Sequence, residues 1–273
     1  MQKVLFVLSE YGYWGEELVG PLEALEANGI VVDFATPNGK TPHALPPSMD
    51  PDYVDPPLGK TVVSEEMAEK VASIENSKML KNPINLSKLF KQRPYLSHPQ
   101  YLRELEEYND TVDKASEILD KYCALLIVGG SGPIVDLVNN QRVHDLILSF
   151  YRKDKPIAAE CYGVACLAFA REYGLRKSII EGKRVTGHPL EYDYKDGTGF
   201  LGTDFVIGPP PYPLEYILRD AVGKDGEFIG NVGKNISAIV DYPFITGRST
   251  ADSYKTGELL AEVLNNGLKR YGF

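Results

Sequence analysis

The sequence has few cysteines and no concentration of positive charge. Its three cysteines, Cys123, Cys161 and Cys166, are too few and too odd in number for the disulfide framework of a secreted domain. Lysine and arginine together number 29 against 38 acidic residues, a net charge of −9, and no basic cluster stands apart from the acids. A nucleic-acid groove and an anionic membrane surface are therefore not expected as partners.

Long apolar runs are also missing. No stretch approaches the roughly 20 residues that span a bilayer, and the opening segment, MQKVLFVLSEYG, reaches an acid and a glycine too early for a signal peptide. We therefore expect a cytoplasmic protein. With 273 residues, of which 43% are hydrophobic, the chain can bury a core without disulfides or metal ions.

The first part of the chain predicts a β-α-β unit. Residues 3–9 (KVLFVLS) form a continuous apolar run that suits a buried strand, and a glycine-rich turn follows. The next residues have a helical apolar pattern, with Pro21 in the first turn and Asn28-Gly29 as the stop. Residues 30–36 (IVVDFAT) predict a second strand, so a parallel sheet is favoured.

An insertion is predicted next. Residues 36–58 contain seven prolines, with three aspartates among them, and residues 65–74 and 99–121 have helical patterns. We interpret residues 41–110 as a helical, proline-rich cap that covers one end of the sheet. The chain as a whole, residues 1–273, is expected to form one domain.

The sheet is expected to resume in the second half of the chain. Residues 124–128 (ALLIV) and 157–159 (IAA) predict buried strands. Helices are expected over 143–151, after the segment 160–163 as far as Tyr173, and over 251–268 behind a Ser249-Thr250 cap. Further strands are expected over 184–186, 237–240 and 244–246. The pattern indicates an α/β three-layer sandwich with a mainly parallel, flavodoxin-like sheet.

Cys161 is the strongest candidate for a catalytic nucleophile. It lies where an apolar strand meets a helix, with Gly163 two residues later, which is typical of a nucleophile elbow. We expect the N–H groups of the helix to stabilise the thiolate and to lower the pKa of the Cys161 thiol. The alternative is a small apolar residue at a strand end, and Cys123 and Cys166 are interpreted in that way.

Four segments carry a family resemblance, in order over most of the chain: ELVGP (17–21), GGSGPIVDL (129–137), AAECYGVACL (158–167) and FITGRSTAD (244–252). They resemble the ThiJ/PfpI superfamily, which has the class I glutamine amidotransferase-like fold. The nearest branch holds glyoxalase III enzymes and heat-shock chaperone-like proteins. The resemblance implies a reactive Cys161, no cofactor and a homodimer.

The resemblance also implies an acid at Glu17, four residues before Pro21 and just past the first strand. A carboxyl group in that crevice would be desolvated, so its pKa would rise and it would serve as a proton shuttle. The neighbouring Glu16 is the alternative, and a solvated acid favoured by the helix dipole is the simpler interpretation of either residue. The spacing to Pro21 favours Glu17.

A set of backbone groups is expected to face the substrate. Gly129 and Gly130 allow close approach of the main chain and supply N–H groups for an oxyanion. The resemblance implies that they form an oxyanion hole together with Tyr162, with Ser131 beside them.

The chain departs from the pattern of this branch at two positions. Tyr162 follows the cysteine where the branch usually has histidine, and Ser131 stands where its Gly-Gly-His-Gly motif has one. Asp193, in VTGHPLEYD, matches the acid of the branch by motif context. His188 is the one histidine near that acid and either replaces the missing base or is a surface or capping residue. Other branches rely on the cysteine and the early acid alone, here Cys161 and Glu17.

Several other residues are given structural interpretations. His43 with Asp50, Asp52 and Asp55 resembles a metal cluster, but proline-rich acidic loops are usually solvated, so no metal is expected. Glu160 should point to the opposite face from Cys161 and be structural. The aromatic segment around Tyr192, Tyr194 and Phe200 forms either a pocket wall or a dimer surface.

The resemblance implies a function in which the Cys161 thiolate adds to a small reactive carbonyl compound such as methylglyoxal. Glu17 then moves protons through an enediol to give a 2-hydroxy acid such as lactate. One alternative is an amide hydrolase like the glutamine amidotransferases, which need a His-x-Glu pair where this chain reads TGRSTAD. The others are a stress-related chaperone, a redox sensor in which Cys161 is oxidised, and a specialised biosynthetic enzyme.

Overall fold

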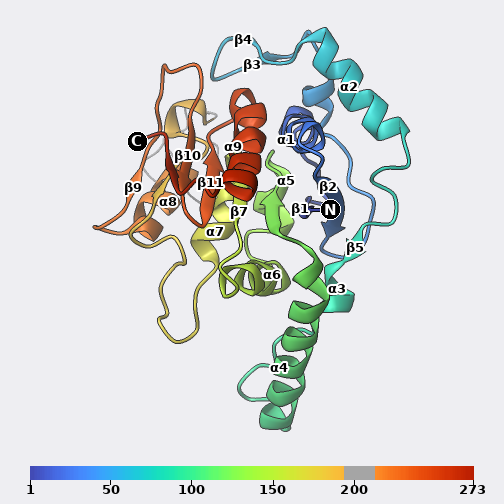
Figure 1. The fold of residues 1–273 in the computed structure, drawn as a ribbon, viewed down its shortest axis with the longest axis vertical. Helices are drawn as coiled ribbons and strands as arrows, with labels where there is room; N and C mark the ends of the chain where they lie inside the picture. The colour runs from blue at the N-terminus through green and yellow to red at the C-terminus, as the bar shows by residue number, and fades with distance from the viewer. Residues whose placement is uncertain (194–212) are drawn as a thin grey trace.

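The computed structural model describes residues 1–193 and 213–273, and its centre is a mainly parallel sheet (Figure 1). In spatial order its strands are β12 (Arg270–Tyr271), β10 (Ala238–Asp241), β11 (Phe244–Gly247), β7 (Ile157–Glu160), β6 (Ala124–Ile127), β1 (Lys3–Val7), β2 (Val31–Thr36) and β5 (Ile84–Asn85). The strands from β11 to β5 are parallel, whereas β10 is antiparallel to both β11 and β12. The predicted α/β fold with a mainly parallel sheet is confirmed.

Helices cover both faces of the sheet, because its strands are buried on both sides. Val4 and Phe6 of β1 face the core beneath α1 (Gly15–Ala27) and α9 (Ser253–Asn266). Leu5 and Val7 face the core beneath α6 (Gln141–Tyr151), α7 (Ala165–Phe169) and α8 (Leu214–Val222). This alternation along one strand produces the three layers.

Helices α1 and α9 lie side by side (Figure 1) and approach each other closely. A Cβ atom at Gly257 would lie 2.6 Å from the Cα of Pro21, and one at Gly20 would lie 2.7 Å from the backbone nitrogen of Tyr254. Pro21 is inside α1 and not in its first turn as the sequence predicts, because the helix begins at Gly15. The missing N–H of Pro21 therefore leaves the carbonyl of Glu17 without its usual partner within the helix.

Residues 41–110 lie in two places. The hairpin of β3 (Val54–Asp55) and β4 (Lys60–Thr61) and helix α2 (Glu65–Asn76) lie near the start of α1, where Tyr13 pairs with Ala44. Strand β5 then joins the edge of the main sheet, and α3 (Leu86–Leu89) and α4 (Tyr101–Ile118) follow. Figure 1 shows α4 projecting at the end of the molecule opposite α2. Only the first part of the expected cap lies close to the carboxyl end of β1.

The helix predicted to follow residues 160–163 and to run as far as Tyr173 is shorter than expected. Residues Cys161–Val164 form a 3₁₀ turn (η3), and α7 ends at Phe169. It stops there because the carbonyl of Ala170 accepts a hydrogen bond from the N–H of Ile179, next to the bridge between Arg171 and Ser178.

Three further elements complete the described chain. Helix α5 (Gly132–Asp136) precedes α6, and β8 (Arg184–Val185) pairs with β9 (Glu227–Phe228) outside the main sheet. The predicted strand over 184–186 thus exists but belongs to a separate small sheet. Within the described ranges, no helix has the length and apolar character needed to cross a membrane.

Candidate active site

Cys161 lies on a sharp turn at the carboxyl end of β7. Its φ is +50°, in the left-handed region that non-glycine residues rarely adopt, and the η3 turn begins at this residue. Gly163 allows the turn to pack tightly, because a Cβ there would lie 2.9 Å from the carbonyl oxygen of Ile127 on β6. This is the strained strand-to-helix geometry of a nucleophile elbow.

Glu17 of α1 lies beside the thiol and is only 2% exposed. Gly129 makes the space for this contact, since a Cβ at that position would lie 2.1 Å from Oε2 of Glu17 and 2.8 Å from Cβ of Cys161. Burial raises the pKa of Glu17 to about 8, against smaller opposing effects of Cys161 and the Gly130 N–H. The carboxyl group is therefore mostly protonated at neutral pH. Glu16 points elsewhere and accepts a hydrogen bond from Oγ1 of Thr250 at 2.6 Å.

The direction of the thiol pKa differs from the sequence prediction. Burial raises the pKa of Cys161 well above its ordinary value, and the negative charge of Glu17 acts in the same direction. The backbone N–H groups of Gly130 and Tyr162 favour the thiolate but have a smaller effect. The desolvation of a side chain that is 6% exposed therefore outweighs the stabilisation of the thiolate by the helix N-terminus. This thiol needs a base to remove its proton.

His188 stands in the position of such a base. Its Nδ1 lies 3.7 Å from Sγ of Cys161, and its Nε2 lies 3.2 Å from Oδ1 of Asp193. The second contact is not aligned as a hydrogen bond, so it is an electrostatic contact in this structure. Cys161, His188 and Asp193 nevertheless follow one another in space, an order that would suit a nucleophile, a base and an acid.

Tyr162 supports this arrangement. Its ring stacks on that of His188, with centroids 4.3 Å apart and planes 23° apart, and its hydroxyl donates to Oδ1 of Asp193 at 2.7 Å. Tyr162 thus occupies the sequence position of the usual histidine and positions both His188 and Asp193.

The backbone groups expected to form an oxyanion hole are partly brought together. The N–H groups of Gly130 and Tyr162 face the sulfur atom. Gly130 has a φ of +92°, and a Cβ there would lie 2.5 Å from the backbone nitrogen of Trp14. Gly129 contributes space, and its carbonyl accepts a hydrogen bond from Trp14. Ser131 is exposed at the start of α5, and its side chain makes no capping hydrogen bond there.

Glu160 lies closer to the site than its position in the sequence indicates. The side chain is fully buried on the face covered by α1 and α9, from which Glu17 also comes. Burial and then the charge of Glu17 raise the pKa of Glu160 well above its ordinary value, and its carboxyl group lies near Ser253 and Thr256 of α9. Strand alternation directs Glu160 away from Cys161, but it also brings a second acid with a raised pKa close to Glu17. The alternation of residues along β7 predicts the direction in which Glu160 points, but it does not predict that Glu160 lies near Glu17.

The remaining candidates lie apart from Cys161. Nδ1 of His43 pairs with Glu75 at 2.9 Å, and among the residues the structure describes no group of three or more His, Cys, Asp or Glu side chains is arranged to hold a metal ion. Cys166 is buried in the core, and Cys123 is half-buried with its sulfur near the carbonyl of Lys3.

The aromatic segment is only partly described. The Tyr192 ring lies edge-on to that of His188, 6.0 Å away, and so forms part of the wall of the site. Tyr194 and Phe200 fall outside the described residues.

Comparison with known sequences identifies the family. A family model described as ThiJ/PfpI family-like matches residues 8–188. The chain is 29% identical over 181 residues to the protein/nucleic acid deglycase HchA of Pseudomonas aeruginosa, a match that covers 66% of this chain and 58% of the relative. An uncharacterized protein of Methanocaldococcus jannaschii is 27% identical over 187 residues, covering 68% of this chain and 60% of that protein.

Solved structures share the fold over nearly the whole chain. Glyoxalase III of Candida albicans superposes with a TM-score of 0.66 at 18% identity, covering 95% of each chain. The Rapid Encystment Protein of Francisella tularensis gives a TM-score of 0.66 at 20% identity, covering 97% of this chain and 99% of that one. The match of the family model over residues 8–188 shows that the chain belongs to the ThiJ/PfpI superfamily, and the relatives that it resembles include an HchA deglycase.

Proposed function

We propose that this protein is a cofactor-independent cysteine enzyme that acts on small reactive carbonyl compounds, converting methylglyoxal to lactate. The observation that carries the proposal is the position of the Cys161 thiol, which has a protonated Glu17 beside it and Nδ1 of His188 at 3.7 Å. A soft nucleophile between an acid and a base is suited to covalent addition followed by proton transfer. Relatives named as a deglycase and a glyoxalase III support the same class of substrate.

The first step would be addition of sulfur to the aldehyde carbon. His188 removes the thiol proton as the carbon–sulfur bond forms, which avoids a free thiolate in a site that disfavours it. The electron pair of the carbonyl bond moves to oxygen, and this oxyanion is stabilised by the N–H groups of Gly130 and Tyr162. Glu17 donates its proton to that oxygen, leaving a hemithioacetal and a carboxylate.

The second step would move hydrogen between the two carbons. The Glu17 carboxylate removes the hydrogen from the sulfur-bearing carbon, and the imidazolium of His188 protonates the neighbouring oxygen to give an enediol. Glu17 returns a proton to the neighbouring carbon, while His188 removes one from the oxygen next to sulfur, so that a thioester remains. Water attacks the thioester and loses a proton to Glu17, and the sulfur that departs takes the proton of His188.

The test is formation of lactate from methylglyoxal by purified protein. Wild type is expected to turn over, and Cys161→Ala is expected to have no activity above background. Cys123→Ala is the matched control, because that half-buried cysteine lies at the start of β6 and outside the site. Full activity in Cys161→Ala would overturn the proposal.

Two alternatives have less support. A glutamine amidotransferase would need a histidine after the last strand, but β11 is followed by Arg248, which is 2% exposed and donates to the carbonyl oxygens of Asn231 and Lys234. A redox sensor would need a thiol that ionises readily, whereas burial raises the pKa of the Cys161 thiol well above its ordinary value. Measuring ammonia release from glutamine and the mass of the peroxide-treated protein would test each alternative directly.

A further inference from the structure

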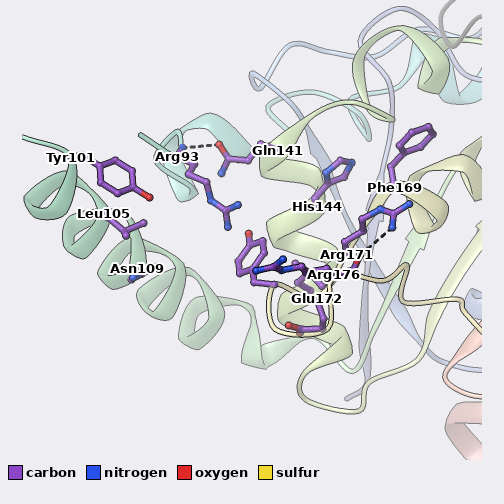
Figure 2. A pocket seen from close by; sticks show the side chains of 12 residues that line it. Arg93, Tyr101, Leu105, Asn109, Gln141, His144, Phe169, Arg171, Glu172 and Arg176 are labelled. Atoms are coloured by element: carbon purple, nitrogen blue, oxygen red, sulfur yellow. Dashed lines mark hydrogen bonds between the residues drawn. The ribbon is translucent and has the colours of Figure 1, made fainter. Parts of the chain in front are cut away.

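A cavity lies outside the Cys161 site. It has a volume of about 580 Å³ and lies between α4, α6 and the segment that follows α7, as Figure 2 shows. None of the candidate site residues Cys161, Glu17, His188 and Asp193 lines it. Its volume falls within the range of about 300–1,000 Å³ that is usual for sites of small ligands.

Three arginines line this cavity, although the chain has a net charge of −9. Arg93 comes from the segment before α4, and Arg171 and Arg176 come from the segment after α7 (Figure 2). All three are exposed, and none forms an ion pair with another residue that the structure describes. The one acid in the lining, Glu172, is already held by Arg152 through two hydrogen bonds of 2.7 and 3.2 Å. The cavity therefore keeps an excess of positive charge.

The base of the cavity is fixed by a buried hydrogen-bond network. Asp145, which is 2% exposed, accepts hydrogen bonds from the hydroxyls of Tyr108 at 2.7 Å and Tyr173 at 2.8 Å, and another from Gln141. The guanidinium of Arg93 lies 3.8 Å from the centroid of the Tyr173 ring. Because these rings are held in place, the orientation of Arg93 is defined before any ligand arrives.

Arg171 and Arg176 are also connected to each other. Nη1 of Arg171 donates to the carbonyl oxygen of Arg176 at 3.2 Å, as the dashed line in Figure 2 shows. This bond uses one of the donors of Arg171 and leaves the others available, and the Arg176 guanidinium makes no hydrogen bond to a described residue. Tyr101, Leu105 and Phe169 add apolar surface to the walls.

We propose that this cavity binds a small organic phosphate with a planar body, of the size of a nucleoside monophosphate. Planar guanidinium groups match phosphate oxygens in bidentate pairs, and several of them favour an ion of more than one charge over a single carboxylate. The aromatic and aliphatic walls would contact the planar part of the ligand.

The experiment is isothermal titration of the full chain with AMP, and with adenosine, inorganic phosphate and citrate as comparisons. AMP is expected to bind at a single site at least about tenfold tighter than inorganic phosphate, and more weakly as salt increases. Adenosine is expected not to bind. No saturable binding of AMP, or equal affinity for citrate, would overturn the assignment to an organic phosphate.

The variants locate the binding. The affinity for AMP is expected to fall at least about tenfold in the triple variant Arg93→Gln/Arg171→Gln/Arg176→Gln, because charge-assisted hydrogen bonds to the phosphate are lost. Its control removes the same charge from three exposed arginines elsewhere, Arg103, Arg219 and Arg270, and is expected to bind as wild type does.

A single substitution, Arg176→Gln, provides a test in case the triple variant does not fold. It is expected to leave the fold intact, because that side chain makes no hydrogen bond or ion pair to a described residue. It is expected to weaken AMP binding as well. Unchanged AMP affinity in the triple variant, or in Arg176→Gln if the triple variant does not fold, would overturn the proposal.

Discussion

Nδ1 of His188 lies 3.7 Å from Sγ of Cys161, although the two residues are 27 positions apart in the sequence. In the branch that the sequence resembles, the histidine usually follows the cysteine directly, and here Tyr162 takes that position. The Tyr162 ring stacks on His188, so the residue at this position contacts a histidine that arrives from another segment and that we propose as the base. The activity proposed for Cys161 depends on this contact.

Loss of the base should slow the reaction without unfolding the protein. His188→Gln removes the group that accepts the thiol proton, so kcat/KM for methylglyoxal is expected to fall by about 10²–10⁴-fold. The steady-state rate of lactate formation measures this. His43→Gln is the matched control, since the His43 side chain is 73% exposed and pairs with Glu75 away from the site. Equal activity of His188→Gln and His43→Gln would rule out the role of base.

Tyr162 is expected to act by positioning. Tyr162→Phe keeps the ring that stacks on His188 but removes the hydroxyl that donates to Asp193 at 2.7 Å. Asp193 then loses a fixed partner, and kcat is expected to fall by about tenfold, the equivalent of one hydrogen bond. The rate against pH is the second readout, because a group that orients the base shifts the acidic limb of that profile. A tenfold loss with an unchanged profile would assign Tyr162 a structural role only.

Glu17 gives a prediction for stability. Its pKa is raised to about 8 in the folded protein, so the folded state holds a proton that the unfolded state releases near the ordinary carboxyl pKa of 4.5. The contribution of Glu17 to the stability of wild type should therefore decrease as pH rises from about 5 to about 8 and then level off. Glu17→Gln is neutral throughout and lacks this loss.

The melting temperature measured against pH tests this prediction. The difference between Glu17→Gln and wild type is expected to be small at pH 5, to grow in favour of the variant up to about pH 8, and to remain constant above it. A difference that does not depend on pH would contradict the raised pKa. The same variant is expected to lose at least about 100-fold in kcat, since it can neither donate nor accept the proton.

Gly129 gives a steric prediction. In Gly129→Ala the new Cβ would lie 2.1 Å from Oε2 of Glu17, so the carboxyl group must move away from the thiol. Lactate formation is expected to fall by at least about 100-fold, the size of the general acid–base contribution. Gly174→Ala is the control, because nothing lies within 4 Å of its Cβ position and its φ is not positive. Wild-type activity in Gly129→Ala would show that the contact between Glu17 and Cys161 is not needed.

The layers of the fold are predictable from the sequence because the central strands have an unmistakable apolar pattern. Residues of β1, β6 and β7 are continuous apolar runs, and such runs are typical of parallel strands covered on both faces. Boundaries that depend on distant partners were less predictable. The early end of α7 depends on a hydrogen bond between Ala170 and Ile179, and the separate pairing of β8 depends on β9, which no local pattern reveals.

The site residues that belong to short contiguous motifs are predictable from the sequence. Cys161 follows a strand, and Glu17 has a fixed spacing to Pro21, so both were named from short segments. Burial of the thiol was not predictable, because it depends on packing by Gly129 and Glu17 from other parts of the chain. The three arginines that line the cavity between α4 and α6 come from segments almost 80 positions apart, and composition alone gives no basic cluster there.

The most direct test of the central claim is to observe the covalent intermediate. Glu17→Gln protein is mixed with methylglyoxal that is isotope-labelled at the aldehyde carbon, and the carbon NMR spectrum is recorded without reduction or digestion, because a hemithioacetal reverts to thiol and aldehyde on work-up. Since sulfur would add to the aldehyde while the later transfer of hydrogen between the two carbons is blocked, we expect the signal of a protein-bound hemithioacetal, and its loss when Cys161→Ala is added to the same protein. No such signal from a protein whose wild-type form turns over methylglyoxal, or the same signal with Cys161→Ala, would contradict the proposed role of Cys161.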